Sequence, residues 1–206
     1  MTFLIYVLFG FMIAAMGSIS PSFLNLTVVK FSLRSGKKPA IFLIAGFATI
    51  LFFQANLGAY FANVLMQNSE YIVLIQKIGT IILIILSVNF FRLHYTKGKS
   101  LKKREIVSSK AYLHGIGMSL LNTFAIPFYF TSISFLIGLD LFEYSFLNAL
   151  YFSVGSTVGS FTIYSLYAII AKKIEHKLTT IALKMDFILG CLTGLVGLGN
   201  LVYLLL

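Results

Sequence analysis

Residues 41–53 read IFLIAGFATILFF, a run with no charged side chain and no polar face. The apolar character continues outward on both sides, so that the whole segment covers Pro39–Met66. A helix that is apolar all round must be buried in protein or in lipid, and about 20 such residues are enough to cross a bilayer. We therefore predict a transmembrane helix at this position.

Five further segments have the same length and character: Phe3–Val29, Tyr71–Phe91, Tyr112–Leu139, Tyr144–Ala171 and Ile181–Leu206. The whole chain is 59% hydrophobic and only 11% charged, whereas a soluble domain carries about 25% charged residues. The segments lack the ten-residue alternation of a membrane β-barrel. We predict an all-α integral membrane protein, one transmembrane domain over residues 1–206, with six transmembrane helices in the lipid bilayer.

The basic residues are unevenly distributed along the chain, which carries 16 Lys and Arg against 6 Asp and Glu. All of them except Lys77 fall between the first and second, third and fourth, or fifth and sixth segments, or, for Lys184, at the start of the sixth. Loops rich in Lys and Arg stay in the cytoplasm. This predicts a multi-pass membrane protein with both termini outside. It also argues against a nucleic-acid partner, because the basic excess follows the topology.

Small residues gather on the fifth and sixth segments. Gly155 and Gly159 stand one helical turn apart in the fifth, and Gly190, Gly194 and Gly197 follow a similar spacing in the sixth. Such faces allow helix backbones to approach closely in membranes. We predict that both faces serve helix packing.

The two halves of the chain look alike. Residues 1–93 and 112–206 hold three segments each, separated by a basic cytoplasmic loop at 94–111. Pro21 lies inside the first segment and Pro127 inside the fourth, with small polar residues around each. Because three segments is an odd number, the second half must be inverted in the membrane. The sequence predicts two inverted three-helix repeats.

A proline inside a helix removes one backbone hydrogen bond, and in lipid the freed carbonyl needs another partner. Matching interruptions in two inverted halves point to a transporter binding site. A plain proline kink, stabilised by neighbouring Ser and Thr, is the alternative. The candidate substrate-binding residues are Ser20, Pro21, Ser22, Asn25, Asn56, Asn122, Thr123 and Pro127.

Asp186 lies just inside the sixth segment on the predicted cytoplasmic side. A partly buried aspartate can exchange protons, so Asp186 is a candidate for proton coupling. An interfacial partner for Lys184 is the alternative. The histidines His94, His114 and His176 lack metal-ligand spacing. We expect no metal and no cofactor.

Several short motifs resemble those of the LysE/RhtB family of amino-acid exporters. The family's first-helix Pro-Gly-Pro triplet falls on residues 19–21, and its Gly followed by two basic residues falls on Gly36-Lys37-Lys38. Its second-helix glycine falls on Gly46, and its fourth-helix Asn-Pro-Lys falls on residues 126–128. The third-helix Gly-then-Leu pattern resembles residues 79–83. The resemblance implies six helices in two inverted repeats, a role in amino-acid export and a location in the bacterial inner membrane.

These features favour a secondary transporter that exports amino acids or similar small polar metabolites. No nucleotide-binding loop is present, so an ion gradient or the solute's own gradient would drive it. A non-transporting membrane subunit or assembly partner is the alternative. An intramembrane enzyme is disfavoured, because the segments lack paired acids and Ser–His or Ser–Lys pairs. A chain of 206 residues provides few helices to surround a solute pathway. Assembly of two copies into a homodimer is compatible with this small size.

Overall fold

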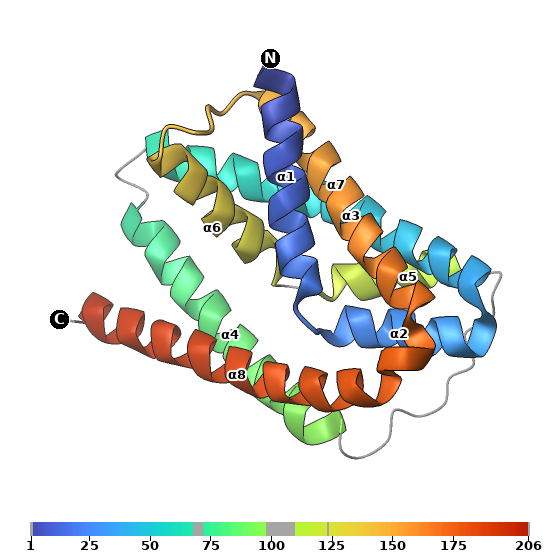
Figure 1. Cartoon of the computed structure of the whole chain (residues 1–206). Coiled ribbons are helices and arrows are strands. Elements are labelled where there is room, and N and C mark those ends of the chain that lie inside the picture. The colour runs from blue at the N-terminus through green and yellow to red at the C-terminus, as the bar shows by residue number, and fades with distance from the viewer. Residues whose placement is uncertain (1, 68–71, 98–109, 123, 206) are drawn as a thin grey trace.

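The computed structural model describes residues 2–67, 72–97, 110–122 and 124–205, with some side chains of the fourth and eighth helices left out. Each regular element in these ranges is an α-helix (Figure 1). The helices are α1 (Thr2–Ile19), α2 (Phe23–Ser35), α3 (Lys37–Gln67), α4 (Ile72–Lys97), α5 (Ala111–Leu120), α6 (Ala125–Gly138), α7 (Phe146–Ile169) and α8 (Ala171–Leu205). The all-α prediction is confirmed for these residues.

The segment that opened the sequence argument forms one long helix. Its predicted extent, Pro39–Met66, agrees with α3 to within two residues at the start and one at the end. In the described part of the chain, α3 and the stretch Phe187–Leu204 of α8 are each long and apolar enough to cross a membrane. Two bent helix pairs raise the number of such spans to up to four. The protein is thus a membrane protein, and the six-span count stays a prediction.

The first and fourth segments are not single helices. The first is divided into α1 and α2, bent by 75° at the break. The fourth is divided into α5 and α6, bent by 64°. In the first segment the reason lies in Pro21, which has no N–H to donate to the preceding turn, so that the helix ends at Ile19.

Two basic stretches that were predicted as loops are largely helical. Residues 172–184 form the first turns of α8, because they contain no Gly or Pro to stop the helix that begins at Ala171. Lys30 and Arg34 lie on α2, which ends before Gly36. Gly36 has a φ of 91°, a conformation that favours glycine, and its N–H donates to the carbonyl of Ser32. The central basic loop lies largely at residues 98–109, outside the described ranges.

Helix α3 lies at the centre of the bundle and packs against α5, α6 and α7 (Figure 1). Helix α1 packs along α7, and α4 packs along α8. The short helix α2 contacts α3, α7 and α8 and so links the central bundle to α8. Small residues on α3 allow the neighbouring helices to pack closely against it. The alanines Ala40, Ala55, Ala59 and Ala62 are all fully buried.

Close backbone contacts between α1 and α7 depend on glycine. A Cβ added at Gly10 would overlap the carbonyl oxygen of Phe152, and one added at Gly155 would overlap that of Val7. Gly159 similarly faces the backbone of Phe11. Only a residue without a side chain permits this approach. The prediction that Gly155 and Gly159 serve helix packing is therefore confirmed.

The contact between α3 and α5 repeats the same geometry. A Cβ added at Gly46 would overlap the carbonyl oxygen of Tyr112, and one added at Gly115 would overlap that of Leu43. In both helix pairs, the carbonyl that an added Cβ would overlap belongs to the residue three positions before the glycine of the opposite helix. Two helix crossings, each between a helix of the first half and one of the second half, thus share one reciprocal arrangement.

The α4–α8 pair is also formed around small residues. Gly194 faces Ser87, and Gly197 faces Ile84. The hydroxyl of Ser87 donates to the carbonyl of Gly190 at 2.8 Å. The prediction that the glycines of the sixth segment serve packing is confirmed.

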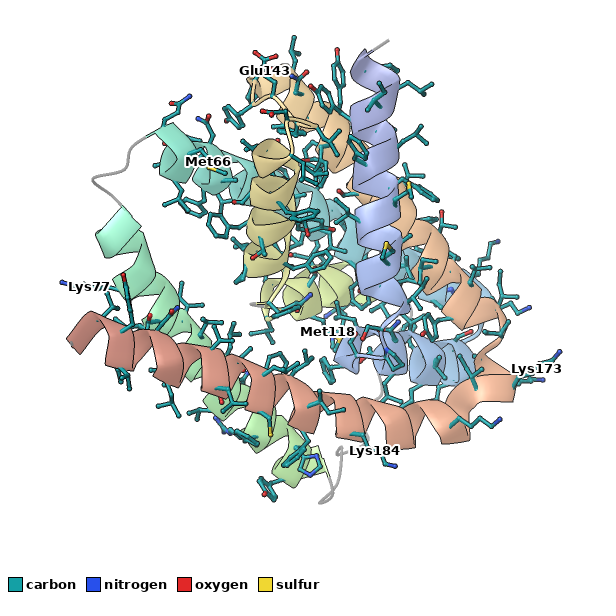
Figure 2. All side chains as sticks on the ribbon, turned by 60° about the vertical axis from the view of Figure 1, so that its left-hand side comes forward. Met66, Lys77, Met118, Glu143, Lys173 and Lys184 are labelled. Atoms are coloured by element: carbon teal, nitrogen blue, oxygen red, sulfur yellow. The ribbon has the colours of Figure 1, made fainter. Side chains whose placement is uncertain are left out.

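Labelled side chains mark the two ends of the molecule, and Lys77 of α4 lies apart from both (Figure 2). Glu143 and Met66 lie at one end, and Lys173 and Lys184 at the other (Figure 2). We call the end with Glu143 the acidic end and the end with Lys173 and Lys184 the basic end.

Candidate functional site

The first helix break is closed by the side chain of Asn25. Its amide nitrogen donates to the carbonyl of Ser18 at 2.8 Å, an acceptor left free where α1 ends. Its Oδ1 accepts the backbone N–H of Ser22 at 3.1 Å and also the hydroxyl of Ser22. Asn25 is fully buried. A buried amide with these partners replaces the backbone bonds that the helix loses around Pro21.

Helix α7 from the other half of the chain reaches the same break. The hydroxyl of Tyr167 donates to the carbonyl of Ile19 at 2.8 Å. One residue further along α7, the carbonyl of Ala168 accepts the hydroxyl of Ser32 of α2 at 2.8 Å. The break is therefore bonded both internally and to α7.

The second break is bonded to α3 in a comparable way. The side-chain nitrogen of Gln54 lies 3.3 Å from the carbonyl of Ser119 and 3.4 Å from that of Asn122, so it donates to both. The hydroxyl of Ser119 donates to the carbonyl of Phe47 at 3.3 Å. Each break is thus bonded by a side chain from the long central helix of the opposite half: Tyr167 of α7 for the first and Gln54 of α3 for the second.

The two breaks lie close together. The ring of Phe128, next to Pro127, covers Gly17 of α1, where an added Cβ would lie 2.7 Å from the ring carbon Cζ. Pro127 itself lies in the first turn of α6. The N–H groups of a first turn have no acceptor within their own helix, so a proline there removes no helix hydrogen bond. The break precedes this proline rather than falling on it.

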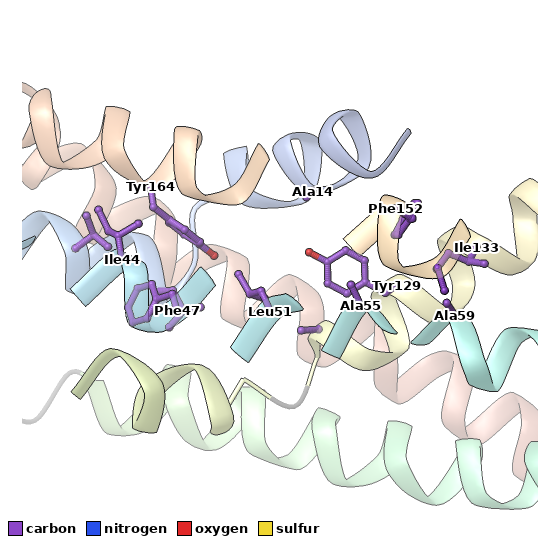
Figure 3. Close-up of a cluster of buried hydrophobic side chains, with 14 of the residues drawn as sticks. Ala14, Ile44, Phe47, Leu51, Ala55, Ala59, Tyr129, Ile133, Phe152 and Tyr164 are labelled. Atoms are coloured by element: carbon purple, nitrogen blue, oxygen red, sulfur yellow. The ribbon is translucent and has the colours of Figure 1, made fainter. Parts of the chain in front are cut away.

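A cluster of hydroxyl groups lies between the breaks. It consists of Ser18 of α1, Tyr129 of α6, and Ser156 and Tyr164 of α7, which we call the hydroxyl cluster. The hydroxyl of Tyr129 faces Ser156, and that of Tyr164 faces Ser18. The two tyrosine hydroxyls point toward each other beside Leu51 of α3 (Figure 3). The exposed fractions of Tyr129 and Tyr164 are only 3% and 5%.

Several buried polar atoms around this cluster lack a protein partner. Among the described side chains they include Oε1 of Gln54 and Oγ of Ser153. The neighbouring Thr157 and Ser160 instead donate to carbonyls one turn earlier in α7. Buried polar atoms are rarely left unpaired, and where they are, an additional bound group is one explanation.

A groove of about 530 Å³ leads from the surface to the second break. Gln54 and Asn56 of α3 line it together with Leu120 and Ile126, which flank the break. Asn56 donates to the carbonyl of Phe52 in its own helix at 3.0 Å. A second groove of the same volume, at the acidic end of the bundle, is lined by Asn63, Gln67, Asp140 and Glu143 among others.

The predicted site residues are therefore distributed over the two breaks and the first groove. Ser20, Pro21, Ser22 and Asn25 form the first break, and Asn122 and Pro127 flank the second. Asn56 lies in the groove that reaches the second break.

Two further candidates were predicted that the structure does not describe in full. Thr123 lies outside the described residues. Asp186 lies on α8, which packs against α4 and α2, and its side chain is not described. Its part in proton coupling stays a prediction.

The sequence argument did not assign the hydroxyl cluster or Gln54 to the site. One signal was available. Tyrosine in membrane proteins concentrates at the interfaces, whereas Tyr129 and Tyr164 lie well inside their apolar segments. A tyrosine at that depth needs a polar partner for its hydroxyl. Gln54, an amide within an apolar run, carried a similar signal.

Comparison with curated proteins and with solved structures found no match. A family model does match, and it covers residues 15–204, which include both helix breaks and all helices from the end of α1 onward. That family is described as the LysE type translocator, so the resemblance seen in the short sequence motifs extends over nearly the whole chain. The chain therefore belongs to the LysE type translocator family and is a membrane transporter.

Proposed function

We propose that this protein is a secondary transporter that exports amino acids or similar small polar metabolites by alternating access. The observation that carries the proposal is the meeting of two helix breaks, each bonded to the long helix of the other half. Broken helices at the interface of two repeats provide polar backbone groups to a solute inside an otherwise apolar protein. Movement of one half against the other would then expose that solute to each side in turn.

The helix contacts support two inverted repeats. If α1, α2, α3 and α4 correspond to α5, α6, α7 and α8, then the α1–α7 contact corresponds to the α5–α3 contact. The reciprocal glycine pairs, Gly10 with Gly155 and Gly115 with Gly46, match under that correspondence. The α4–α8 and α3–α7 contacts map onto themselves. A twofold axis through the centre of the bundle would produce this pattern.

We further propose an inner-membrane location with the basic end in the cytoplasm. Gln67 and Lys173 are both exposed, and they belong to the acidic and the basic end respectively. After replacement of Cys191, single cysteines at these two positions are expected to show opposite labelling by a membrane-impermeant maleimide in intact cells. The Gln67→Cys protein should react, and the Lys173→Cys protein only after the cells are opened. Labelling of both positions from outside would contradict the proposed topology.

The hydroxyl cluster offers the sharpest test of transport. Tyr129→Phe and Tyr164→Phe each remove one buried hydroxyl and keep the ring that packs against its neighbours. We expect each to lower solute flux in proteoliposomes by about fivefold, because a solute at the breaks loses a hydrogen-bonding partner worth about 1 kcal/mol. The yield of folded protein should be unchanged.

Tyr151→Phe is the matched control. Tyr151 is half-buried at the other end of α7 and packs edge-on against Phe3, away from the hydroxyl cluster. Its flux is expected to equal that of the unmodified protein. If no solute of a broad amino-acid panel moves in any variant, the protein is instead a non-transporting membrane subunit or assembly partner.

A further inference from the structure

Five exposed basic residues lie where two helix junctions meet. One junction lies between α2 and α3 and carries Arg34, Lys37 and Lys38 within five consecutive residues. The other lies between α7 and α8 and carries Lys172 and Lys173 in the first turn of α8. We call these five residues the basic junction.

The two junctions are held against each other by packing and by a hydrogen bond. The hydroxyl of Ser32, near the end of α2, donates to the carbonyl of Ala168, near the end of α7, at 2.8 Å. Leu26 and Val29 of α2 form a buried apolar cluster with Ala171, the first residue of α8. In Figure 1 the end of α2, the start of α3 and the start of α8 lie close together. Basic side chains from both halves of the chain therefore share one surface.

The positive charge of this surface is concentrated. Residues 30–38 contain four basic side chains and no acid, and residues 171–177 contain three lysines and one acid, Glu175. The lysines at the start of α3 and α8 also stand at helix N-termini, where a positive side chain is unfavourable because the helix end is itself partly positive. An anion bound beside these groups would reduce the repulsion among them.

Exposed apolar side chains adjoin the basic ones. Ile41 and Phe42 follow one turn after the lysines of α3, and both are exposed. Ile169 and Ile170 stand directly before the first turn of α8 and are exposed as well. Each pair of lysines is therefore bordered by apolar surface within about one helical turn.

A phospholipid with an anionic headgroup matches both features of this surface. Its phosphate accepts charge-assisted hydrogen bonds from Lys and Arg, and its acyl chains cover apolar side chains. The position is suitable too, because α3 continues from its first lysines directly into the apolar run that is long enough to cross a membrane. A nucleic acid or an acidic protein would use the positive charge but leave the apolar side chains in water, which is unfavourable.

We propose that the basic junction binds an anionic phospholipid. The headgroup contacts Arg34, Lys37 and Lys38 from one half of the chain and Lys172 and Lys173 from the other. Because α2 begins at the first helix break, the bound lipid joins the two halves next to that break and stabilises their packing. This binding surface does not depend on which solute the protein transports.

The test is thermal unfolding of the purified full-length protein in detergent, followed by helical circular dichroism, with added probes. Dioleoylphosphatidylglycerol supplies the anionic headgroup, and dioleoylphosphatidylcholine supplies the same acyl chains without net charge. Inorganic phosphate and a peptide of eight aspartates supply negative charge without acyl chains. We expect phosphatidylglycerol to raise the melting temperature by about 5 °C more than phosphatidylcholine does. Phosphate and the peptide should each raise it by no more than about 1 °C.

Single charge removals show whether the effect belongs to the basic junction. Lys37→Gln and Lys173→Gln, one from each helix junction, should each raise the phosphatidylglycerol concentration needed for half of the shift by about fivefold. Lys77→Gln is the matched control, because Lys77 is exposed on α4 away from both ends of the molecule. It should leave that concentration unchanged, and so should Lys173→Arg, which keeps the charge. Without lipid, each variant should unfold at the temperature of the unmodified protein, since the replaced side chains are exposed.

Each possible result decides the matter. A shift that is specific to phosphatidylglycerol and weakened by Lys37→Gln and Lys173→Gln supports the inference. Equal shifts with the two lipids overturn it, because the charge of the headgroup then contributes nothing. An equal weakening by Lys77→Gln also overturns it, since the net charge of the whole protein is then responsible. A shift as large with phosphate or with the aspartate peptide assigns the surface to a soluble anion or to an acidic protein instead of a lipid.

Discussion

Gly115→Ala is expected to destabilise the protein strongly, whereas Gly117→Ala, two residues later in the same helix, is expected to be neutral or stabilising. The added methyl group at Gly115 would overlap the backbone carbonyl of Leu43, so that α5 and α3 must move apart. Overpacking of this kind costs about 3 kcal/mol. At Gly117 nothing lies within 4 Å of the added Cβ, and alanine is the better helix former by about 1 kcal/mol.

The measurement is thermal unfolding in detergent, followed by helical circular dichroism. The sole cysteine, Cys191, provides a second probe through a thiol-reactive dye, because it is partly buried in α8. The melting temperature of the Gly115 variant should fall by several degrees and that of the Gly117 variant should not. Gly155→Ala should reproduce the fall, since it meets the carbonyl of Val7 in the corresponding α1–α7 crossing. Equal behaviour of Gly115→Ala and Gly117→Ala would contradict the close approach of α3 and α5.

Asn25→Leu is expected to have an effect of similar size. The substitution keeps the approximate volume but leaves the carbonyl of Ser18 and the N–H of Ser22 without their partner at a fully buried position. Unpaired buried backbone groups of this kind cost about 3 kcal/mol together. The free energy of unfolding should decrease by that amount in a denaturant titration, and the first helix break should become the most easily opened part of the molecule.

Asn56→Leu is the matched control for that change. Asn56 is only half-buried, and its single described bond goes to the carbonyl of Phe52, which remains bonded within α3 after the substitution. Stability should therefore change little. A loss of stability as large as that of Asn25→Leu would show that the first break does not depend specifically on Asn25.

The α3 segment shows how much a local pattern can determine. A long apolar run without an internal proline or a charge predicts a long helix, and α3 extends over the predicted residues. The break near Pro21 was predicted as a site of disturbance for the same local reason, because the missing N–H of proline is a property of the residue itself. The 75° bend and the division into two helices were not predicted, because proline removes a bond but does not define the direction in which the chain continues.

The partners of the two breaks depend on residues far apart in the chain. Tyr167 and Ile19, or Gln54 and Ser119, are brought together only by the packing of helices from opposite halves. Nothing in either local sequence indicates that its polar groups will meet. The same is true of Tyr129 and Tyr164, whose hydroxyls point toward each other beside Leu51 of α3 (Figure 3).

The sequence by itself determined that this chain is helical and apolar, where its charges lie, and that a proline interrupts its first segment. These are properties of single residues and their near neighbours, and they depend on solvent and backbone chemistry alone. The tertiary structure alone decided that the two breaks lie close together and that a hydroxyl cluster lies between them. It also decided the partners of each break. Asn25 and Tyr167 bond to the first break, and Gln54 bonds to the second. Those contacts require glycine-mediated helix crossings, whose geometry is a property of two helices together.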